Sequence, residues 1–158
     1  MTEPPTTEGA RGFTLIRVFD APRELVWEVF TKPEHFTHWF GGSDTAVPME
    51  TLAMDVRPGG AWSAVMNTPD GRELPFAGTY REVVEPERLV FTFDNTNDRS
   101  DPNVEVATVT FNDLGEKTEV VFNQTGHLPE DVYPRTREGT STFFDALAER
   151  LAELQAQV

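Results

Sequence analysis

The sequence contains no cysteine in its 158 residues, and this absence excludes several kinds of chemistry. Disulfide bonds, thiolate metal ligands and cysteine nucleophiles are all ruled out. A chain without disulfides suits a reducing compartment, so we expect a cytoplasmic protein. No apolar run approaches the roughly 20 residues that a membrane-spanning helix needs, and no signal peptide precedes the first predicted strand. We therefore expect no membrane span.

Basic residues are also scarce. Thirteen Lys and Arg residues stand against twenty-seven Asp and Glu residues, which gives a formal net charge of −14. A surface of this charge favours solubility and repels nucleic acid and anionic lipid, so we expect no nucleic-acid partner. The charge also disfavours an anionic ligand, unless a local basic pocket overrides it.

Motifs for metal binding and catalysis are missing as well. His35 and His38 could share one face of a short helix, but no third ligand lies nearby, and His127 is remote in the sequence. None of the four serines lies in a Gly-x-Ser-x-Gly motif. The glycine pairs lack the lysine and the spacing of a phosphate-binding loop. The sequence therefore predicts no metal site, no cofactor and no catalytic residue.

The length of the chain predicts one domain. Residues 1–11 hold no apolar run and are predicted to form a flexible tail, so the domain would span residues 12–158. A strand over 13–19 precedes two short helices, the first beginning at Pro22 and the second after a capping-box sequence at 31–34. Apolar residues recur at helical spacing in both helices, and their predicted buried faces consist of Leu25, Val26, Val29 and Phe30, then Phe36, Trp39 and Phe40.

From residue 45 to residue 125, apolar and polar residues alternate in the pattern of strands with one buried face. Turn sequences at 69–71 and 113–115 predict hairpins, whereas the polar segment 95–103 predicts an exposed connection. The spacing of the turns predicts an antiparallel sheet of about seven strands and an α+β fold. One face of the strands is rich in aromatic residues, and only the final helix is long enough to cover it.

The final helix begins near Tyr133, and its character changes along its length. Its second half carries an apolar stripe that consists of Phe144, Leu147, Leu151 and Leu154. The same face of the first half carries small or polar residues, and Gly139 lies beside them. A glycine within a helix costs about 1 kcal/mol relative to alanine, so it indicates either a closely approaching strand or room for a ligand. A helix with one slim half cannot pack flush on a sheet, and we predict a cavity there.

Aromatic residues of the sheet and short helices, with polar residues of the final helix, would line this cavity. The candidates are Trp39, Phe40, Met54, Trp62, Met66, Phe76, Tyr80, Phe91, Phe93, Phe122, Thr136, Arg137, Thr140 and Phe144. Aromatic residues also fill ordinary cores, so about half of this set is expected to be core packing. A buried acid or base among Glu50, Asp55, Arg57 and Tyr80 could support proton chemistry. We expect instead that Asp55 and Arg57 pair with neighbours and brace the adjacent turn.

Five segments carry motifs that resemble a known family. They are 19–27 (FDAPRELVW), 33–35 (PEH), 39–41 (WFG), 55–60 (DVRPGG) and 76–90 (FAGTYREVVEPERLV). They are similar to the START-like (SRPBCC) superfamily, and within it to the group named after the activator of the ninety-kilodalton heat-shock protein's ATPase. The resemblance runs from about Phe13 to Leu154.

The resemblance implies a helix-grip fold, in which a curved seven-stranded antiparallel sheet surrounds a long C-terminal helix and leaves a deep cavity. Relatives bind lipids, sterols, polyketides and plant hormones in that cavity, and a few catalyse reactions. The namesake of the group stimulates a chaperone ATPase through its surface. The resemblance implies no catalytic residue.

Three functions therefore stay open. The first is binding of a small hydrophobic or aromatic molecule of the lipid, sterol or polyketide class, without catalysis. The second is an enzyme of the cyclase or hydrolase type that acts on such a ligand. The third is a co-chaperone-like stimulator of a heat-shock ATPase, with a protein partner and a role in stress response. Either a monomer or a homodimer is compatible with the sequence.

Overall fold

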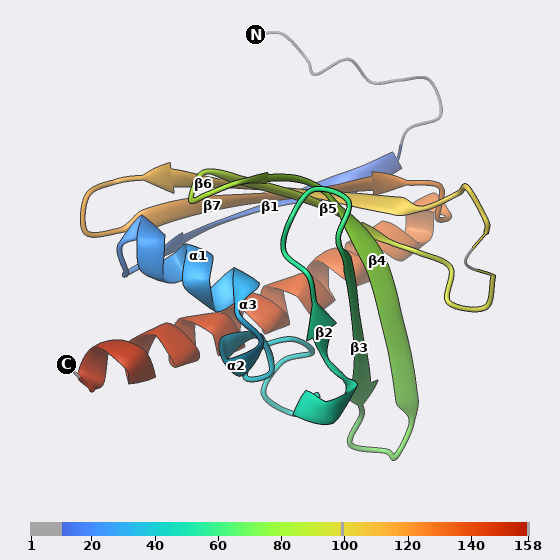
Figure 1. Cartoon of the computed structure of the whole chain (residues 1–158), viewed down its shortest axis with the longest axis horizontal. Coiled ribbons are helices and arrows are strands. Elements are labelled where there is room, and N and C mark those ends of the chain that lie inside the picture. Colours follow the sequence, from blue (N-terminus) through green and yellow to red (C-terminus); the bar gives the residue numbers. More distant parts are fainter. Residues whose placement is uncertain (1–10, 99, 158) are drawn as a thin grey trace, which may run out of the picture.

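The computed structural model describes residues 11–98 and 100–157 as a curved antiparallel sheet wrapped around one long helix (Figure 1). The strands are β1 (Arg11–Phe19), β2 (Ala53–Met54), β3 (Ala61–Asn67), β4 (Glu73–Val84), β5 (Arg88–Phe93), β6 (Glu105–Asp113) and β7 (Thr118–Gly126). The helices are α1 (Arg23–Thr31), α2 (Pro33–Phe36) and α3 (Tyr133–Ala156), with short 3-10 helices η1 (Met49–Thr51) and η2 (Glu130–Val132). Within the described ranges, every helix is too short or too polar to serve as a membrane span.

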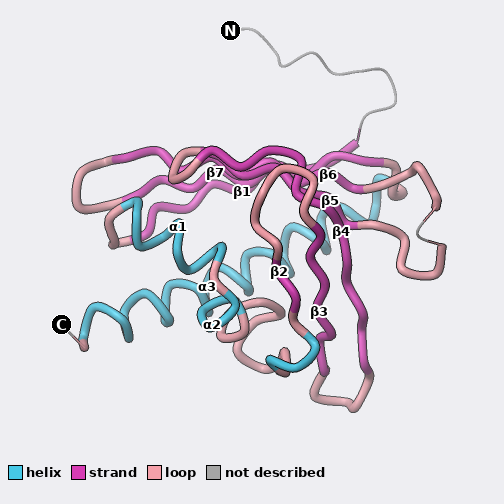
Figure 2. Tube along the Cα trace, viewed as in Figure 1, coloured by secondary structure: helices cyan, strands magenta, loops and turns pink. Residues whose placement is uncertain are grey.

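The predicted α+β helix-grip fold with seven strands is confirmed. The strands follow in the order β1-β7-β6-β5-β4-β3-β2, and all neighbouring pairs are antiparallel. β3 and β4 run steeply away from β6, β7 and β1, and α3 crosses beneath the sheet as one continuous helix (Figures 1 and 2). Residues 1–10 of the predicted tail lie outside the described residues. Arg11, which the prediction included in the tail, is instead the first residue of β1 and pairs with Gly126.

The predicted faces are buried except for the half-buried Leu25, but α2 ends before Trp39 and Phe40, and the predicted capping box does not form. Val26, Val29 and Phe30 are buried, as expected from their spacing. The Thr31 hydroxyl donates to the Trp27 carbonyl 2.8 Å away, whereas a capping box would have it accept a backbone N–H of α2. This bond closes the last turn of α1, and the start of α2 has no side-chain cap.

Alternating apolar residues at Leu52, Met54 and Val56 indicate a longer strand than the structure contains. Only Ala53–Met54 pairs with β3, because the chain then turns sharply toward Ala61. Within this turn the Arg57 guanidinium lies 2.8 Å from the Asp55 carboxylate. Asp55 and Arg57, which were predicted to pair with neighbours, thus pair with each other within this turn.

Side chains of α3 cover the outer edge of β1, which would otherwise be a free sheet edge. The Arg17 guanidinium lies 2.9 Å from both the Asp145 carboxylate and the Ser141 hydroxyl. The Arg137 guanidinium donates to the Thr14 carbonyl at 3.1 Å, so one of the unpaired carbonyls of the edge is satisfied. Exposed strand edges invite unwanted pairing with other chains, and these contacts protect this one.

Gly78 of β4 lies where two strands approach each other too closely for a side chain. A Cβ atom at this position would stand 1.7 Å from the Thr92 carbonyl oxygen and 2.6 Å from the indole nitrogen of Trp62. The buried Trp62 indole donates to that same carbonyl at 3.0 Å. The absence of a side chain at Gly78 thus permits a buried hydrogen bond at the centre of the sheet.

We predict that Gly78→Ala lowers the free energy of unfolding by about 2–3 kcal/mol, because backbone has to move to admit the methyl group. Urea unfolding followed by tryptophan fluorescence measures the change. Gly139→Ala is the matched control, because a Cβ there meets no atom within 4 Å and alanine is the better helix former, so stability should stay equal or rise. Equal stabilities of the Gly78→Ala variant and the wild type would contradict this account.

His35 joins α2 to α3 through a hydrogen bond that requires its neutral form. The Arg150 guanidinium donates to the His35 Nδ1 atom at 3.3 Å through Nε, and a second guanidinium nitrogen lies 3.1 Å away. Burial, and secondly the charge of Arg150, lower the pKa of His35 below its ordinary value of 6.5. The unfolded chain therefore binds more protons than the folded chain as pH falls through 6.5.

Because the folded chain binds fewer protons, the stabilisation from neutral His35 is present above pH 6.5 and is lost as pH falls toward the lowered pKa of His35. His35→Asn places a carbonyl oxygen near the Nδ1 position and removes the titration. Its unfolding free energy should therefore depend less on pH between about 7 and 5 than that of the wild type. Urea denaturation at several pH values compares the slopes, with His38→Asn as the control. Identical slopes for wild type and His35→Asn would rule this linkage out.

Candidate functional site

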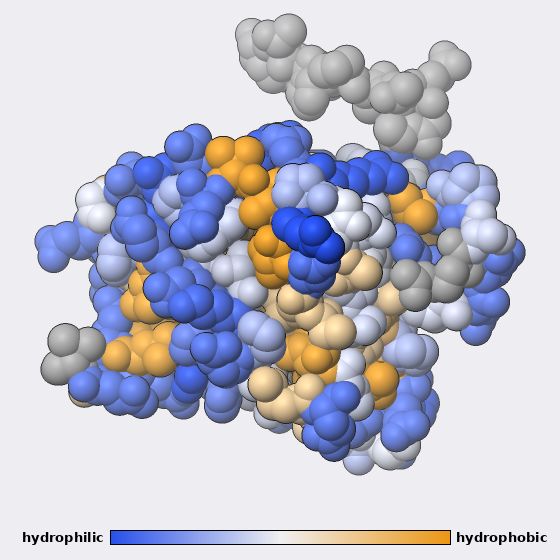
Figure 3. Space-filling view, viewed as in Figure 1, coloured by the Kyte–Doolittle hydropathy of each residue, from blue (hydrophilic) through white to orange (hydrophobic). Residues whose placement is uncertain are grey.

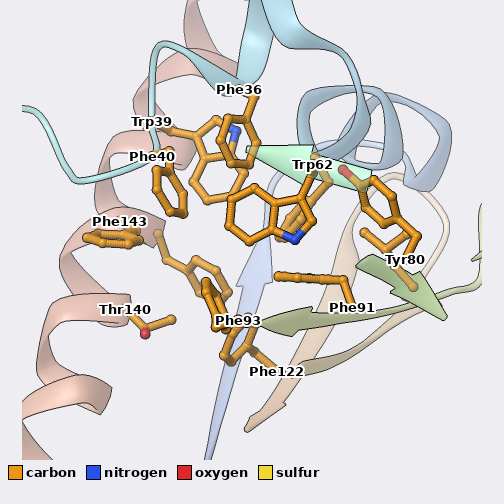
Figure 4. A pocket seen from close by; sticks show the side chains of 13 residues that line it. Phe36, Trp39, Phe40, Trp62, Tyr80, Phe91, Phe93, Phe122, Thr140 and Phe143 are labelled. Atoms are coloured by element: carbon orange, nitrogen blue, oxygen red, sulfur yellow. The ribbon is translucent and has the colours of Figure 1, made fainter. Parts of the chain in front are cut away.

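The centre of the trough between sheet and helices is filled by aromatic rings. Side chains from α1, α2, the strands and α3 converge there and leave a space of only about 40 Å³, which suits a water molecule but not an organic ligand (Figure 4). The lining residues are Phe30, Phe36, Trp39, Phe40, Trp62, Tyr80, Leu89, Phe91, Phe93, Phe122, Thr140, Phe143 and Phe144. This set forms the aromatic core of the protein.

The rings of the aromatic core pack mainly edge to face. Trp62 meets Phe93 at 5.5 Å and Phe91 at 5.9 Å between ring centroids, in both cases nearly perpendicular. Phe122 meets Phe144 of α3 at 5.9 Å in the same manner. Such pairs bring the positive edge of one ring to the negative face of another and add to the stabilisation from burial. The core is therefore closed by specific packing.

A larger, solvent-open cavity of about 630 Å³ adjoins the aromatic core along the first half of α3. It lies among the end of β7, the first half of α3 and the connection between β5 and β6, which is drawn in yellow in Figure 1. The lining residues are Phe40, Pro75, Phe76, Phe93, Asp94, Asn95, Thr96, Asn103, Glu105, Gln124, His127, Leu128, Thr136, Gly139, Thr140 and Phe143. We call this space the α3 cavity.

The side chains of α3 account for the position of the α3 cavity. Leu147 and Leu151 in the second half of the helix are 0% and 2% exposed, so they fill the space against the sheet. In the first half the same role falls to Thr136, Gly139 and Thr140, which are too small to reach the strands. No atom stands within 4 Å of a Cβ placed on Gly139, so a close strand does not explain this glycine. The predicted space beside the slim half of the helix is present.

The predicted site residues divide into three groups. Five line the α3 cavity, namely Phe40, Phe76, Phe93, Thr136 and Thr140. Six line only the small space in the aromatic core, namely Trp39, Trp62, Tyr80, Phe91, Phe122 and Phe144. Met54, Met66 and Arg137 line neither space. Met54 pairs with Trp62 in the sheet, Met66 is buried in the core, and Arg137 bonds to β1.

Tyr80 and Tyr133 are neutral hydroxyl groups in this structure. Burial first, and the charge of Asp55 second, raise the pKa of Tyr80 far above its ordinary value. Burial, and next a hydrogen bond to Glu105, raise the pKa of Tyr133 to about 12. Neither phenol therefore supplies a phenolate base at neutral pH.

A buried carboxylate forms the polar end of the α3 cavity. Glu105, at the start of β6, is only 6% exposed. Its Oε1 atom accepts hydrogen bonds from the Gln124 amide at 3.1 Å and from the Tyr133 hydroxyl at 2.8 Å. Its Oε2 atom accepts from the His127 backbone N–H at 2.9 Å, and the His127 Nδ1 atom lies 3.4 Å away. Three donors, from β7, the connection that follows it and α3, thus hold one carboxylate in place.

Gly126 explains how the carboxylate can lie so close to β7. A Cβ atom on Gly126 would stand 1.9 Å from the Glu105 Oε2 atom, so any other residue would displace the carboxylate. The Tyr133 hydroxyl also accepts the Leu128 N–H at 3.2 Å, which joins the end of β7 to the start of α3. In the described part of the chain, no three His, Asp or Glu side chains are grouped as a metal would require.

The polar end was not predicted, although the sequence held a signal for it. Glu105 continues the inward-facing series Ala107, Val109 and Phe111, and every second residue of a strand points to the same face. Gln124 likewise continues the inward series of β7 after Phe122. A charged and an amide residue in register with two buried faces indicate a polar group inside the trough. Phe143 was also missed, because it lies one position before the apolar stripe of α3.

Comparisons with known proteins agree with this fold. A family model described as Activator of Hsp90 ATPase homolog 1-like protein matches residues 20–152, and this match confirms the resemblance that the motifs indicate. No curated protein matches the sequence. A solved structure from Nitrosomonas europaea is 26% identical with a TM-score of 0.78, and the match covers 92% of this chain and 97% of that one.

Two further solved structures are similar. A protein from Chromobacterium violaceum is 24% identical with a TM-score of 0.75, and the match covers 92% of this chain and 98% of that one. The AHSA1 protein of Silicibacter pomeroyi is 19% identical with a TM-score of 0.77, and the match covers 93% of this chain and 99% of that one. Both similarities show that the fold is shared.

The hydrogen bond from Tyr133 to Glu105 predicts the effect of removing one hydroxyl group. Tyr133→Phe keeps the aromatic ring but leaves the Leu128 N–H without this acceptor and the buried carboxylate with one donor fewer. We expect a loss of about 1.5–3 kcal/mol in the free energy of unfolding. Chemical denaturation measures the loss. Asn112→Ala, which removes the exposed bond to Glu119, is the control and should change stability by about 0.5 kcal/mol or less. An equally small effect of Tyr133→Phe would refute the assigned role.

Proposed function

Since this chain belongs to the family of Activator of Hsp90 ATPase homolog 1-like proteins, we propose a function that its fold can provide through the α3 cavity. The protein binds a small, largely apolar molecule of the lipid, sterol or polyketide class and does not transform it. The observation that carries the proposal is the open space of about 630 Å³ beside the slim half of α3. Ligand pockets in proteins commonly measure about 300–1,000 Å³.

The walls of the α3 cavity have the composition that such a ligand requires. Phe40, Phe76, Phe93 and Phe143 form an apolar side against which a hydrophobic body can pack. The rest of the wall carries hydrogen-bonding groups, which include Glu105, the cross-strand neighbour of Phe93. Pockets for small molecules usually combine apolar walls with a few polar groups that fix the orientation of the ligand.

The aromatic core supports the proposal because it makes one wall of the cavity rigid. Phe40, Phe93 and Phe143 line both the aromatic core and the α3 cavity. Phe40 packs on Phe76 at 5.4 Å and on Phe143 at 5.3 Å between ring centroids. Rings held by several neighbours lose little further freedom when a ligand binds, so binding costs less entropy.

A surface-acting role as a stimulator of a heat-shock ATPase is the second candidate. It draws support from the family and from the net charge of −14, which could attract a basic patch on a partner. Figure 3 shows one face on which hydrophilic residues surround hydrophobic residues that gather mainly near its centre. Charged surfaces of this kind favour association that weakens with salt.

A leucine at Gly139 tests the ligand-binding function. The side chain would project into open space in the wall of the α3 cavity, so Gly139→Leu should remain folded and lose ligand affinity by about tenfold or more. Leucine is also the better helix former, so the ligand-free variant should be at least as stable as the wild type. A thermal-shift screen with lipids, sterols and polyketides identifies ligands, since a ligand at about 100 times its Kd adds about 2.7 kcal/mol.

Gly139→Ala is the matched control, because it changes the same residue and fills much less space. It should bind the ligand nearly as the wild type does. Normal binding by Gly139→Leu would move the ligand site elsewhere. The absence of any shift across the screen would leave the surface-acting role as the better explanation.

A further inference from the structure

The charged side chains among the described lining residues of the α3 cavity have one sign. Among its described lining residues, Asp94 and Glu105 are acidic, and none is Lys or Arg. The remaining polar lining residues are amides, threonines and one histidine. We infer that the ligand of this cavity carries a positively charged amine on its apolar body. This inference rests on the proposed function and adds the charge of the ligand to it.

Glu105 is the group that would recognise the amine. It is nine-tenths buried, and its hydrogen-bond donors are the Gln124 amide, the Tyr133 hydroxyl and the His127 backbone N–H. All three donors are neutral, and they suit the ionised carboxylate, which only accepts hydrogen bonds. They occupy three of its roughly four lone-pair sites and do not cancel its charge. A cation in the adjacent space would supply the opposite charge.

The surroundings strengthen that attraction. An apolar wall lowers the local dielectric, so charges interact more strongly there than at an open surface. Aromatic rings attract cations at their faces, and Phe93 is the cross-strand neighbour of Glu105. The net charge of −14 raises the local concentration of cations around the whole protein. The same three effects disfavour a carboxylate or a phosphate in the cavity.

His127 is the described lining residue that could acquire a competing positive charge. Its Nδ1 atom lies 3.4 Å from the Glu105 Oε2 atom, and its side chain is 49% exposed. A protonated imidazole at this place would pair with the carboxylate. A ligand amine and a charged His127 side chain would therefore compete for the same carboxylate.

The ends of the cavity suggest how the ligand lies. The carboxylate belongs to the start of β6 and is held by β7 and Tyr133, whereas Phe143 and Phe40 stand on the side of the aromatic core. The ammonium group would lie toward Glu105, and the apolar body would lie against the phenylalanine rings. Gly139 would stand beside that body, which agrees with its open surroundings.

Three probes of equal size and different charge test the inference on the wild-type protein. They are 2-(1-naphthyl)ethylamine, 2-(1-naphthyl)ethanol and 1-naphthaleneacetate, measured by titration calorimetry at about pH 8. We expect the amine to bind at least about tenfold more tightly than the alcohol, and the carboxylate to bind most weakly. Equal binding of the three, or preference for the carboxylate, would overturn the inference and leave the proposed function standing. No binding of any probe at about 1 mM would count against the proposed function itself.

A matched pair of variants assigns the preference to one residue. Glu105→Gln removes the charge with little change of shape and should weaken amine binding at least about tenfold, with the alcohol affected less than about threefold. Glu119→Gln removes the same charge from the opposite face of the sheet and should leave both affinities unchanged. Circular dichroism verifies that each variant is folded. If Glu105→Gln does not fold, the wild-type probe series still decides the inference, and a folded Glu105→Gln with unchanged amine affinity would refute it.

Discussion

The packing of α3 against the curved sheet is the constraint on which the rest of the structure depends. A helix presents its side chains at nearly constant spacing, whereas the sheet is strongly curved, with β3 and β4 steeply inclined to β6, β7 and β1 (Figure 1). Leu147 and Leu151 are large enough to close the gap in the second half of the helix. Thr136 and Thr140 are not, so the gap in the first half stays open. One change of side-chain size along one helix thus separates a sealed core from a cavity.

The aromatic residues share one pattern but have two roles, and the tertiary structure decides between them. Trp62, Phe91 and Phe93 all point to the inner face of the sheet. Sequence spacing alone therefore does not distinguish residues that pack in the core from residues that line the cavity. The short helices bring Phe36 and Trp39 onto the same part of the trough, and edge-to-face packing then fills it. The predicted site was therefore centred on residues that the short helices cover. Periodicity reports which face a residue occupies and contains no information on what packs above it.

The fold was predictable because its signals are local and repeated. Alternation along the strands, the turn at 69–71 and the motifs at 19–27 and 76–90 all indicate the same topology. The failed predictions concern competition between neighbouring groups. The Thr31 hydroxyl donates to a carbonyl in the preceding turn of α1 and does not cap α2. The strand near Met54 ends early because the chain enters a tight turn. Glu105 was not predicted because its burial follows only from its register in β6. It is in phase with Ala107 and Val109, so its side chain faces the interior.

Burial of Glu105 connects the architecture of the site with its expected chemistry. A buried carboxylate is costly unless hydrogen bonds satisfy it, and the donors here come from β7, the connection that follows it and the first residue of α3. Gly126 provides the close approach, and Tyr133 bonds to the carboxylate and to the Leu128 N–H at the same time. The polar end of the cavity is consequently formed before any ligand arrives, in contrast to a loop that must first be ordered. The same bonds fix the start of α3 against the sheet, so the slim half of the helix holds its place without large apolar side chains. The group that stabilises the open cavity is therefore the group that gives the cavity its charge.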